Sequence, residues 1–191
     1  MRFARLHSEL KLSMTLLGRL MRDRRGVSAI EFAFIAPILI LLYVGVAETG
    51  NALTLYRRTS TVATTAADLT AQAKAVSTSD LQDIVAASSS ILTPYDPTPL
   101  KIVISSVVAD QNNDGKVAWS YANKGAGRGT NTSYTVPPGL TEPNTSVIVA
   151  EITYDFTPLI NLTQVYSPGS FQMKRTFYAR PRRSLTVAKT N

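Results

Sequence analysis

The feature that most constrains this chain is a run of apolar residues that follows a basic cluster near the N-terminus. Arg24 and Arg25 precede Gly26, and Glu31 is the only charged residue between positions 27 and 47. These 21 residues rise about 31 Å as an α-helix, enough to cross the hydrocarbon core of a bilayer. We therefore expect residues 27–47 to form a single transmembrane helix with one carboxylate near its start.

The charge of Glu31 is energetically unfavourable in this apolar segment, so we expect the carboxylate to have a partner group. A carboxylate inside an apolar segment costs roughly 2.5–3.5 kcal/mol on insertion scales. If the chain is cut before Val27, the new α-amino group is a cation beside hydrocarbon, and Glu31 of the same or a neighbouring chain can offset it. The alternative is a tolerated carboxylate within reach of lipid headgroups. Pro37 removes one helical hydrogen bond and is interpreted either as a kink or as a packing or unwinding site.

The positive charge of the chain is concentrated in its first 26 residues. The whole chain has a net charge of +7, of which +5 falls in residues 1–26. A basic leader predicts that the N-terminus stays cytoplasmic and that the remainder lies across the membrane. The leader itself is either an amphipathic helix on the anionic inner leaflet or a disordered basic arm. Because the charge is so placed, nucleic acid is not the expected partner.

The residue types present exclude several classes of enzyme. The chain has no cysteine, and His7 is its only histidine. A chain cut after Gly26 would contain neither residue, which excludes Cys-His and Ser-His-Asp catalysis and most zinc sites. We therefore expect no enzymatic activity, no cofactor and no metal, and a domain held together by packing without disulfides.

The helix is expected to continue beyond the membrane segment to about Val76. No proline occurs between positions 38 and 93, and small or aliphatic residues recur at steps of four and three. This stripe consists of Leu55, Thr59, Val62, Ala66, Leu69, Ala73 and Val76. A second helix should begin at Ser79 as N-cap and run to about Leu92. Residues 48–92 are thus predicted to be a helical region.

The rest of the chain, residues 93–191, has the composition of an antiparallel sheet. β-Branched and aromatic residues predict strands at 100–108, 116–122, 145–156 and 171–179, and residues 123–143, rich in glycine and proline, predict a long surface loop. The fold class is α+β, a long N-terminal helix packed on about four strands. We expect the helical stripe to contact the sheet face that contains Val103, Val117, Trp119, Val147 and Val149.

Two polar motifs each have a structural and a functional interpretation. Asp110, Asn112 and Asp114 match the start of a calcium loop, but Tyr121 stands where the bidentate Glu is required, so we favour a polar hairpin turn. The C-terminal basic cluster suggests anionic lipid, nucleic acid, or a solvated strand edge that resists aggregation, and we favour the edge or a partner contact. Its members are Lys174, Arg175, Arg180, Arg182 and Arg183.

The string RRGVSAIEFAFIAPILILLYVGVAETG resembles the N-terminal signature of TadE-like and TadG-like proteins, the minor pilins of tight-adherence (Flp, type IVc) pili. The strings DQNNDGKVAW, PNTSVIVAEITYDFTPL and KRTFYARPRRS are also similar to the C-terminal part of such proteins. Some TadG-like members carry a large extra domain and major Flp pilins are very short, so the length of this chain fits a minor pilin.

The resemblance implies a pilin-like fold and a set of processing and assembly residues. A prepilin peptidase would cut between Gly26 and Val27 on the cytoplasmic side. Glu31 would then be the fifth residue of the mature chain and Phe32 the sixth, and with Pro37 they would serve filament assembly.

The same resemblance implies partners and a location. The partners would be the prepilin peptidase, the major Flp pilin, other minor pilins, the inner-membrane assembly platform and the lipid bilayer. The protein would be a single-pass protein of the bacterial inner membrane with a periplasmic C-terminal domain, or extracellular once in the pilus, and would support surface adhesion.

Two other functions remain open from the sequence. Residues 1–47 could be a long signal peptide of a secreted binding domain, cut before Glu48. The chain could also be an uncut single-pass protein that acts as a periplasmic adaptor. The mature N-terminus distinguishes the three hypotheses, being Val27, Glu48 or Met1.

Overall fold

The computed structural model describes residues 25–158 and 171–190 of the 191-residue chain. The predicted leader, residues 1–26, lies outside this range except for its last two residues. The chain forms two compact units, Met1–Ala47 and Glu48–Asn191, and each is described by itself. The elements are α2 (Arg25–Ala71), β1 (Ala75–Val76), α3 (Thr78–Ser89), the 3-10 helix η1 (Ser90–Leu92), β2 (Leu100–Ala109), β3 (Gly115–Ala122), β4 (Ser146–Phe156), β5 (Phe171–Ala179) and β6 (Ala188–Lys189).

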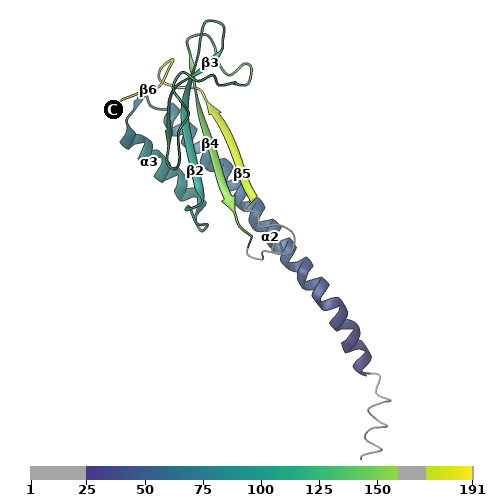
Figure 1. Ribbon diagram of the computed structural model, residues 1–191. Coiled ribbons are helices and arrows are strands. Elements are labelled where there is room, and N and C mark those ends of the chain that lie inside the picture. The colour runs from purple at the N-terminus through teal and green to yellow at the C-terminus, as the bar shows by residue number, and fades with distance from the viewer. Residues whose placement is uncertain (1–24, 159–170, 191) are drawn as a thin grey trace, which may run out of the picture. The chain divides into compact units, whose positions relative to one another are not determined.

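A four-stranded antiparallel sheet organises the second unit. The strand order is β3-β2-β4-β5, so β2 and β4 are central and β3 and β5 lie at the two edges (Figure 1). All four strands were predicted, and each begins and ends within one residue of its predicted bounds. The predicted α+β class, a long N-terminal helix packed on an antiparallel sheet, is confirmed.

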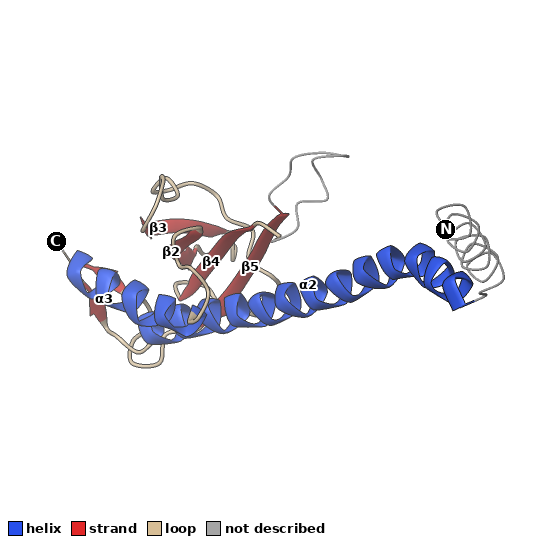
Figure 2. Ribbon diagram, turned by 90° about the horizontal axis from the view of Figure 1, so that it is seen from below, coloured by secondary structure: helices blue, strands red, loops and turns tan. Residues whose placement is uncertain are grey.

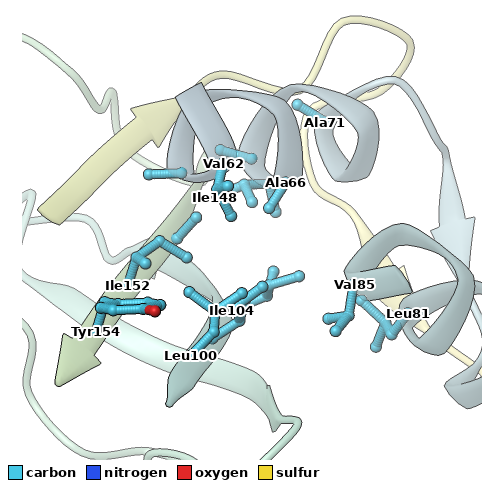
Figure 3. Close-up of a cluster of buried hydrophobic side chains, with 14 of the residues drawn as sticks. Val62, Ala66, Ala71, Leu81, Val85, Leu100, Ile104, Ile148, Ile152 and Tyr154 are labelled. Carbon is cyan, nitrogen blue, oxygen red and sulfur yellow. The ribbon is translucent and has the colours of Figure 1, made fainter. Parts of the chain in front are cut away.

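Residues 48–71 of α2 and the whole of α3 lie on one face of this sheet (Figure 2). The buried positions of α2 form a stripe of mostly small side chains, which brings the helix backbone close to the strands. Figure 3 shows Val62 and Ala66 of α2 facing Ile104, Ile148 and Ile152 of the sheet. The fully or nearly fully buried positions of this stripe are Leu55, Thr59, Val62, Ala63, Ala66, Ala67, Thr70 and Ala71.

Helix α2 ends at Ala71, five residues before the predicted end at Val76. Val76 is buried as expected, but it lies in the short strand β1, which pairs in parallel with β6 near the C-terminus. The backbone N–H of Arg182 donates to the carbonyl oxygen of Ala71 at 2.9 Å. The C-terminal segment therefore satisfies a carbonyl that the end of a helix leaves without an intrahelical partner.

Helix α3 begins with Ser77 as N-cap, so the prediction of Ser79 was wrong by two residues. The Ser77 hydroxyl accepts from the Asp80 N–H at 3.1 Å, and the Asp80 carboxylate accepts from the Ser77 N–H at 2.8 Å. This reciprocal pair is a capping box. Hydrogen bonds from the backbone and side chain of Ser77 hold the pKa of Asp80 below its usual value. The predicted end of this helical stretch at Leu92 is confirmed by η1.

The prediction of which sheet face meets the helices was correct for Trp119 and wrong for the valines. Trp119 belongs to the cluster under α2, whereas Val117, Val147 and Val149 pack with Val107 in a second cluster. Val103, also predicted to face the helix, is half-buried and belongs to neither cluster.

The reason for the error in β3 is a β-bulge. The register shifts between Ser106 and Val107, which lie opposite Trp119 and Val117, so Ala118 is an extra residue on β3. One extra residue reverses the side-chain alternation. Val117 and Trp119 are therefore on opposite faces although they are two positions apart. In β4 the reason is different: Val147, Ile148, Val149 and Ala150 are all fully buried, so no polar alternation marks the faces.

The loop between β3 and β4 lies outside regular secondary structure, as predicted, but it also covers part of the sheet. Tyr134 and Val136 pack against the valine cluster on the face away from α2. The Tyr134 N–H donates to the Gly115 carbonyl at 2.9 Å, and the Val117 N–H to the Thr132 carbonyl at 3.0 Å. A side chain at Gly115 would collide with the Tyr134 carbonyl oxygen. The loop thus protects the outer edge of β3.

Arg128 links this loop to the sheet through an ion pair. Its Nε and Nη2 donate to the two carboxylate oxygens of Glu151 on β4, each at 2.6 Å. Its guanidinium also lies 4.6 Å from the ring centroid of Tyr134. Burial, with a hydrogen bond to Tyr178, raises the pKa of Tyr134. A bidentate ion pair restricts both partners to one geometry, so the loop has a defined position.

Candidate membrane and assembly segment

The predicted processing position lies in the first turn of α2. The helix begins at Arg25, so the Gly26–Val27 peptide bond is at its N-terminal end. Glycine has low helix propensity, so Gly26 weakens the helix locally. A Cβ atom at Gly26 would meet nothing within 4 Å. Among the described residues, none therefore crowds the Cβ direction of Gly26.

The segment that follows exposes apolar side chains around its whole circumference. Exposed fractions reach 76% at Phe34 and 75% at Tyr43, and no described residue from 26 to 47 is buried. The most apolar 18-residue window of the helix has a mean hydropathy of 2.3. Among the described residues this is the one helix long and apolar enough to cross a membrane. A helix that is apolar all round needs an apolar surrounding such as lipid or other helices.

Glu31 lies one helical turn after Val27 on the same face, because positions i and i+4 are neighbours on a helix. Its side chain is exposed. An α-amino group created at Val27 would therefore lie on the face that carries this carboxylate. The geometry permits a pair within one chain as well as a pair with a neighbour.

Phe32 and Pro37, the other predicted assembly residues, lie in the same unbroken helix but point elsewhere. At about 100° per residue, Glu31, Phe32 and Pro37 are directed to three different sides. They do not form one pocket within the chain, and any assembly role would involve different neighbours. Phe32 is 65% exposed. The helix continues through Pro37 without a break.

Tyr43 is a residue of this segment that the sequence analysis did not single out. It lies four positions before Ala47, the end of the expected span, and tyrosine is enriched where a membrane helix meets the headgroups. The sequence signal that could have identified Tyr43 is an aromatic residue with a polar tip near the end of an apolar run.

The C-terminal basic cluster is spread over structural contacts rather than gathered into one patch. Arg175 stacks on Tyr56 of α2, 3.7 Å from the ring centroid, and Arg180 donates to the Leu140 and Gly139 carbonyl oxygens at 2.8 and 2.7 Å. The Arg182 side chain forms an ion pair with Asp68 of α2. These three arginines therefore hold elements of the domain together.

The segment from Asp110 to Asp114 is the turn of a hairpin between β2 and β3, and this prediction is confirmed by their antiparallel pairing. The Asp110 carboxylate accepts from the backbone N–H groups of Asn112 and Asp114 at 2.9 and 3.0 Å. These hydrogen bonds, the one from Asp114 foremost, hold the pKa of Asp110 below its usual value. Asn113 adopts a left-handed conformation with φ of 65°, which asparagine tolerates in turns.

Comparison with known proteins adds one match. Residues 26–68 match the family model of TadE-like proteins, which covers the apolar segment and most of the α2 stretch that packs on the sheet. No curated protein and no solved structure gives a significant match to the chain. The glycine, carboxylate and apolar run of the first unit all lie within the matched residues. Residues 26–68 are therefore similar to the TadE-like family, and this match supports a TadE-like protein of the tight-adherence pilus system.

Proposed function

We propose that this protein is a minor pilin or assembly component of a type IVc (Tad/Flp) pilus with no catalytic role. It is anchored in the inner membrane by residues 27–47 before it enters the filament. Its C-terminal domain, residues 48–191, lies in the periplasm and, after assembly, outside the cell, where it supports surface adhesion. Its partners are the prepilin peptidase, the major pilin, other minor pilins and the assembly platform.

The observation that carries this proposal is the contrast in burial along α2. Residues 26–47 expose all their large apolar side chains except Val44, which is half-buried, whereas residues 55–71 bury one stripe against the domain's own sheet. A segment of the first kind can exchange lipid for the helices of other subunits, because both surroundings are apolar. A segment of the second kind keeps the domain folded in either place.

In this proposal a prepilin peptidase cuts between Gly26 and Val27, and Glu31 pairs with the new α-amino group. Two opposite charges in an apolar surrounding stabilise each other, and either one alone is costly. Pairing with the α-amino group of a neighbouring subunit would set the axial register of the filament.

The mature N-terminus tests the processing step. Mass spectrometry of the protein from membranes and from sheared pili should find Val27 as the first residue. The variant Gly26→Leu should accumulate as full-length precursor and be absent from pili. Gly45→Leu is the matched control, because a Cβ at Gly45 also meets nothing within 4 Å, and it should be processed normally. A mature protein that begins at Glu48 would identify a secreted domain, and one that begins at Met1 an uncut adaptor.

The role of Glu31 is tested separately from processing. Glu31→Leu and Glu31→Gln should insert at least as well as the wild type, since the charge is removed, but the protein should stay in the inner membrane. The double variant Glu31→Leu/Ile35→Glu restores the carboxylate one turn away and should also fail to assemble. Wild-type amounts of Glu31→Leu protein in sheared pili would refute the pairing role.

A further inference from the structure

The two edge strands of the sheet differ in whether another segment forms hydrogen bonds with their outer sides. The outer edge of β3 is hydrogen-bonded by the loop residues 131–134. The strand β5 at the other edge has nine residues, and within 25–158 and 171–190 no backbone group pairs with its outer side (Figures 1 and 2). A strand edge of this length with no backbone partner among the described residues is a template for another strand.

A groove lies beside the C-terminal half of this edge. It has a volume of about 670 Å³ and is bounded by α2 and by the residues that end and follow β5. Phe177, 38% exposed, and Leu69 give it an apolar part. Its polar part consists of Thr64, Thr65 and the ion pair between Arg182 and Asp68. Side chains of a strand added to β5 would have both kinds of surface to contact.

The positive charge of the β5 edge favours an added strand of negative charge. Strand β5 itself contains Lys174 and Arg175 and no Asp or Glu. Lys174 is exposed on β5, and the side chain of Arg182 remains 63% exposed although it pairs with Asp68. In the register centred on Arg175, which pairs the full length of both strands, an antiparallel pair of two β5 strands would bring Lys174 and Arg175 of one copy close to those of the other. Like charges opposed across strands are destabilising, so a second copy of β5 is not the occupant.

We propose that the β5 edge and its groove bind an extended, acidic segment of another polypeptide chain by strand addition. Main-chain hydrogen bonds to β5 would supply the affinity. Carboxylates on the face of Lys174 would supply the selectivity, and the alternate apolar side chains would lie on the face of Phe177 and the groove. The inference rests on the second unit alone and does not depend on whether the chain is cut or assembled.

A peptide titration tests the proposal on the full-length protein in uncharged detergent micelles. The probe is a fluorescent nine-residue peptide of alternating Val and Glu with blocked ends. One comparison peptide replaces Glu with Lys, and another is the acidic peptide N-methylated at alternate positions, which removes its donors. By fluorescence anisotropy, the acidic peptide should bind at least tenfold more tightly than either. Hydrogen exchange should slow in residues 171–179 and not in β2.

Two charge reversals locate the site. Lys174→Glu should weaken the acidic peptide at least fivefold, whereas Lys189→Glu, an equal change at an exposed lysine of β6, should leave its affinity unchanged. Phe177→Ser should weaken the binding of the acidic peptide as well, because Phe177 lines the groove.

Several results would overturn the proposal. These are equal binding of the acidic and basic peptides, unchanged binding after N-methylation, or complete exchange protection of β5 in the protein alone. Protection of β5 by phosphatidylglycerol bilayers without any peptide would make lipid the occupant instead. A dimer that Lys174→Glu strengthens would point to a second copy.

Discussion

The two halves of helix α2 differ in the burial of their apolar side chains. From residue 26 to 47 nothing is buried, and from 55 to 71 the buried positions form one stripe. The first half is apolar all round, while the second alternates apolar positions with Thr, Arg and Asp. The comparison shows that the width of the apolar surface decides the surrounding a helix requires: a full cylinder needs lipid or other helices, and a stripe needs one sheet.

The largest expected effect comes from removing a leucine in each half. Leu55→Ala should lower the free energy of unfolding of the second unit by about 2–5 kcal/mol, because Leu55 is fully buried. Leu41→Ala should leave it unchanged, since Leu41 is 53% exposed. Urea titration followed by the emission of Trp119, the only tryptophan, measures both. Equal losses would contradict the division of α2 into two kinds of helix.

The converse test places a charge in each half. Leu39→Arg should reduce membrane insertion by about 2.5–3.5 kcal/mol, the cost of arginine near the centre of a span. Thr61→Arg should insert normally, because Thr61 is exposed on the polar side of the second half. Extraction of membranes at high pH separates inserted from released protein. Normal insertion of the Leu39 variant would argue against a span at residues 27–47.

A smaller effect is expected where the second unit depends on a single cap. Ser77→Ala removes the hydroxyl that accepts from the Asp80 N–H and should lower the stability of the domain by about 1 kcal/mol. Ser79→Ala, at the position predicted as the cap, is the control and should cost less. Thermal melting of the two variants side by side measures the difference. A larger loss for the Ser79 variant would mean that the cap is misplaced.

The smallest effect is acid sensitivity, and it should be confined to the second unit. The pKa values of Asp80, Asp96, Asp110 and Asp155 are held below the usual 3.8, chiefly by hydrogen bonds from Ser77, Thr98, Asp114 and Lys101 in that order. A depressed pKa stabilises the folded state above pH 3.8, and this contribution is lost as the pH falls through the folded-state value. The melting temperature should therefore be level from neutral pH to about pH 5 and fall below pH 3.8.

Asp155→Asn provides the control for acid sensitivity. It should lower the melting temperature slightly at neutral pH and reduce the fall in acid, because one titrating group has been removed. The helicity of residues 27–47 in micelles should not change over the same range. A domain that becomes more stable in acid would contradict the direction of all four pKa shifts.

Much of the fold could be predicted because its signals are local. The strands β2, β3, β4 and β5 are marked by runs of β-branched residues between turn residues, and the first half of α2 by an uninterrupted apolar run. The end of α2 could not be predicted in this way. Residues 72–76 have no helix breaker, and the helix stops where the C-terminal segment pairs with it, more than a hundred positions away in the sequence.

For the candidate site, the sequence by itself determined the residues and their order. Gly26, Val27 and Glu31 are adjacent or one turn apart, so helix geometry alone places Val27 and Glu31 on one face. The tertiary structure decided everything that depends on pairing between distant segments: which valines face the helix after the bulge at Ala118, how the loop covers β3, and that Trp119 donates to the Val187 carbonyl at 2.7 Å. The physical reason is that side-chain periodicity is a property of one segment, whereas register and edge coverage are set by which distant backbone groups find hydrogen-bond partners.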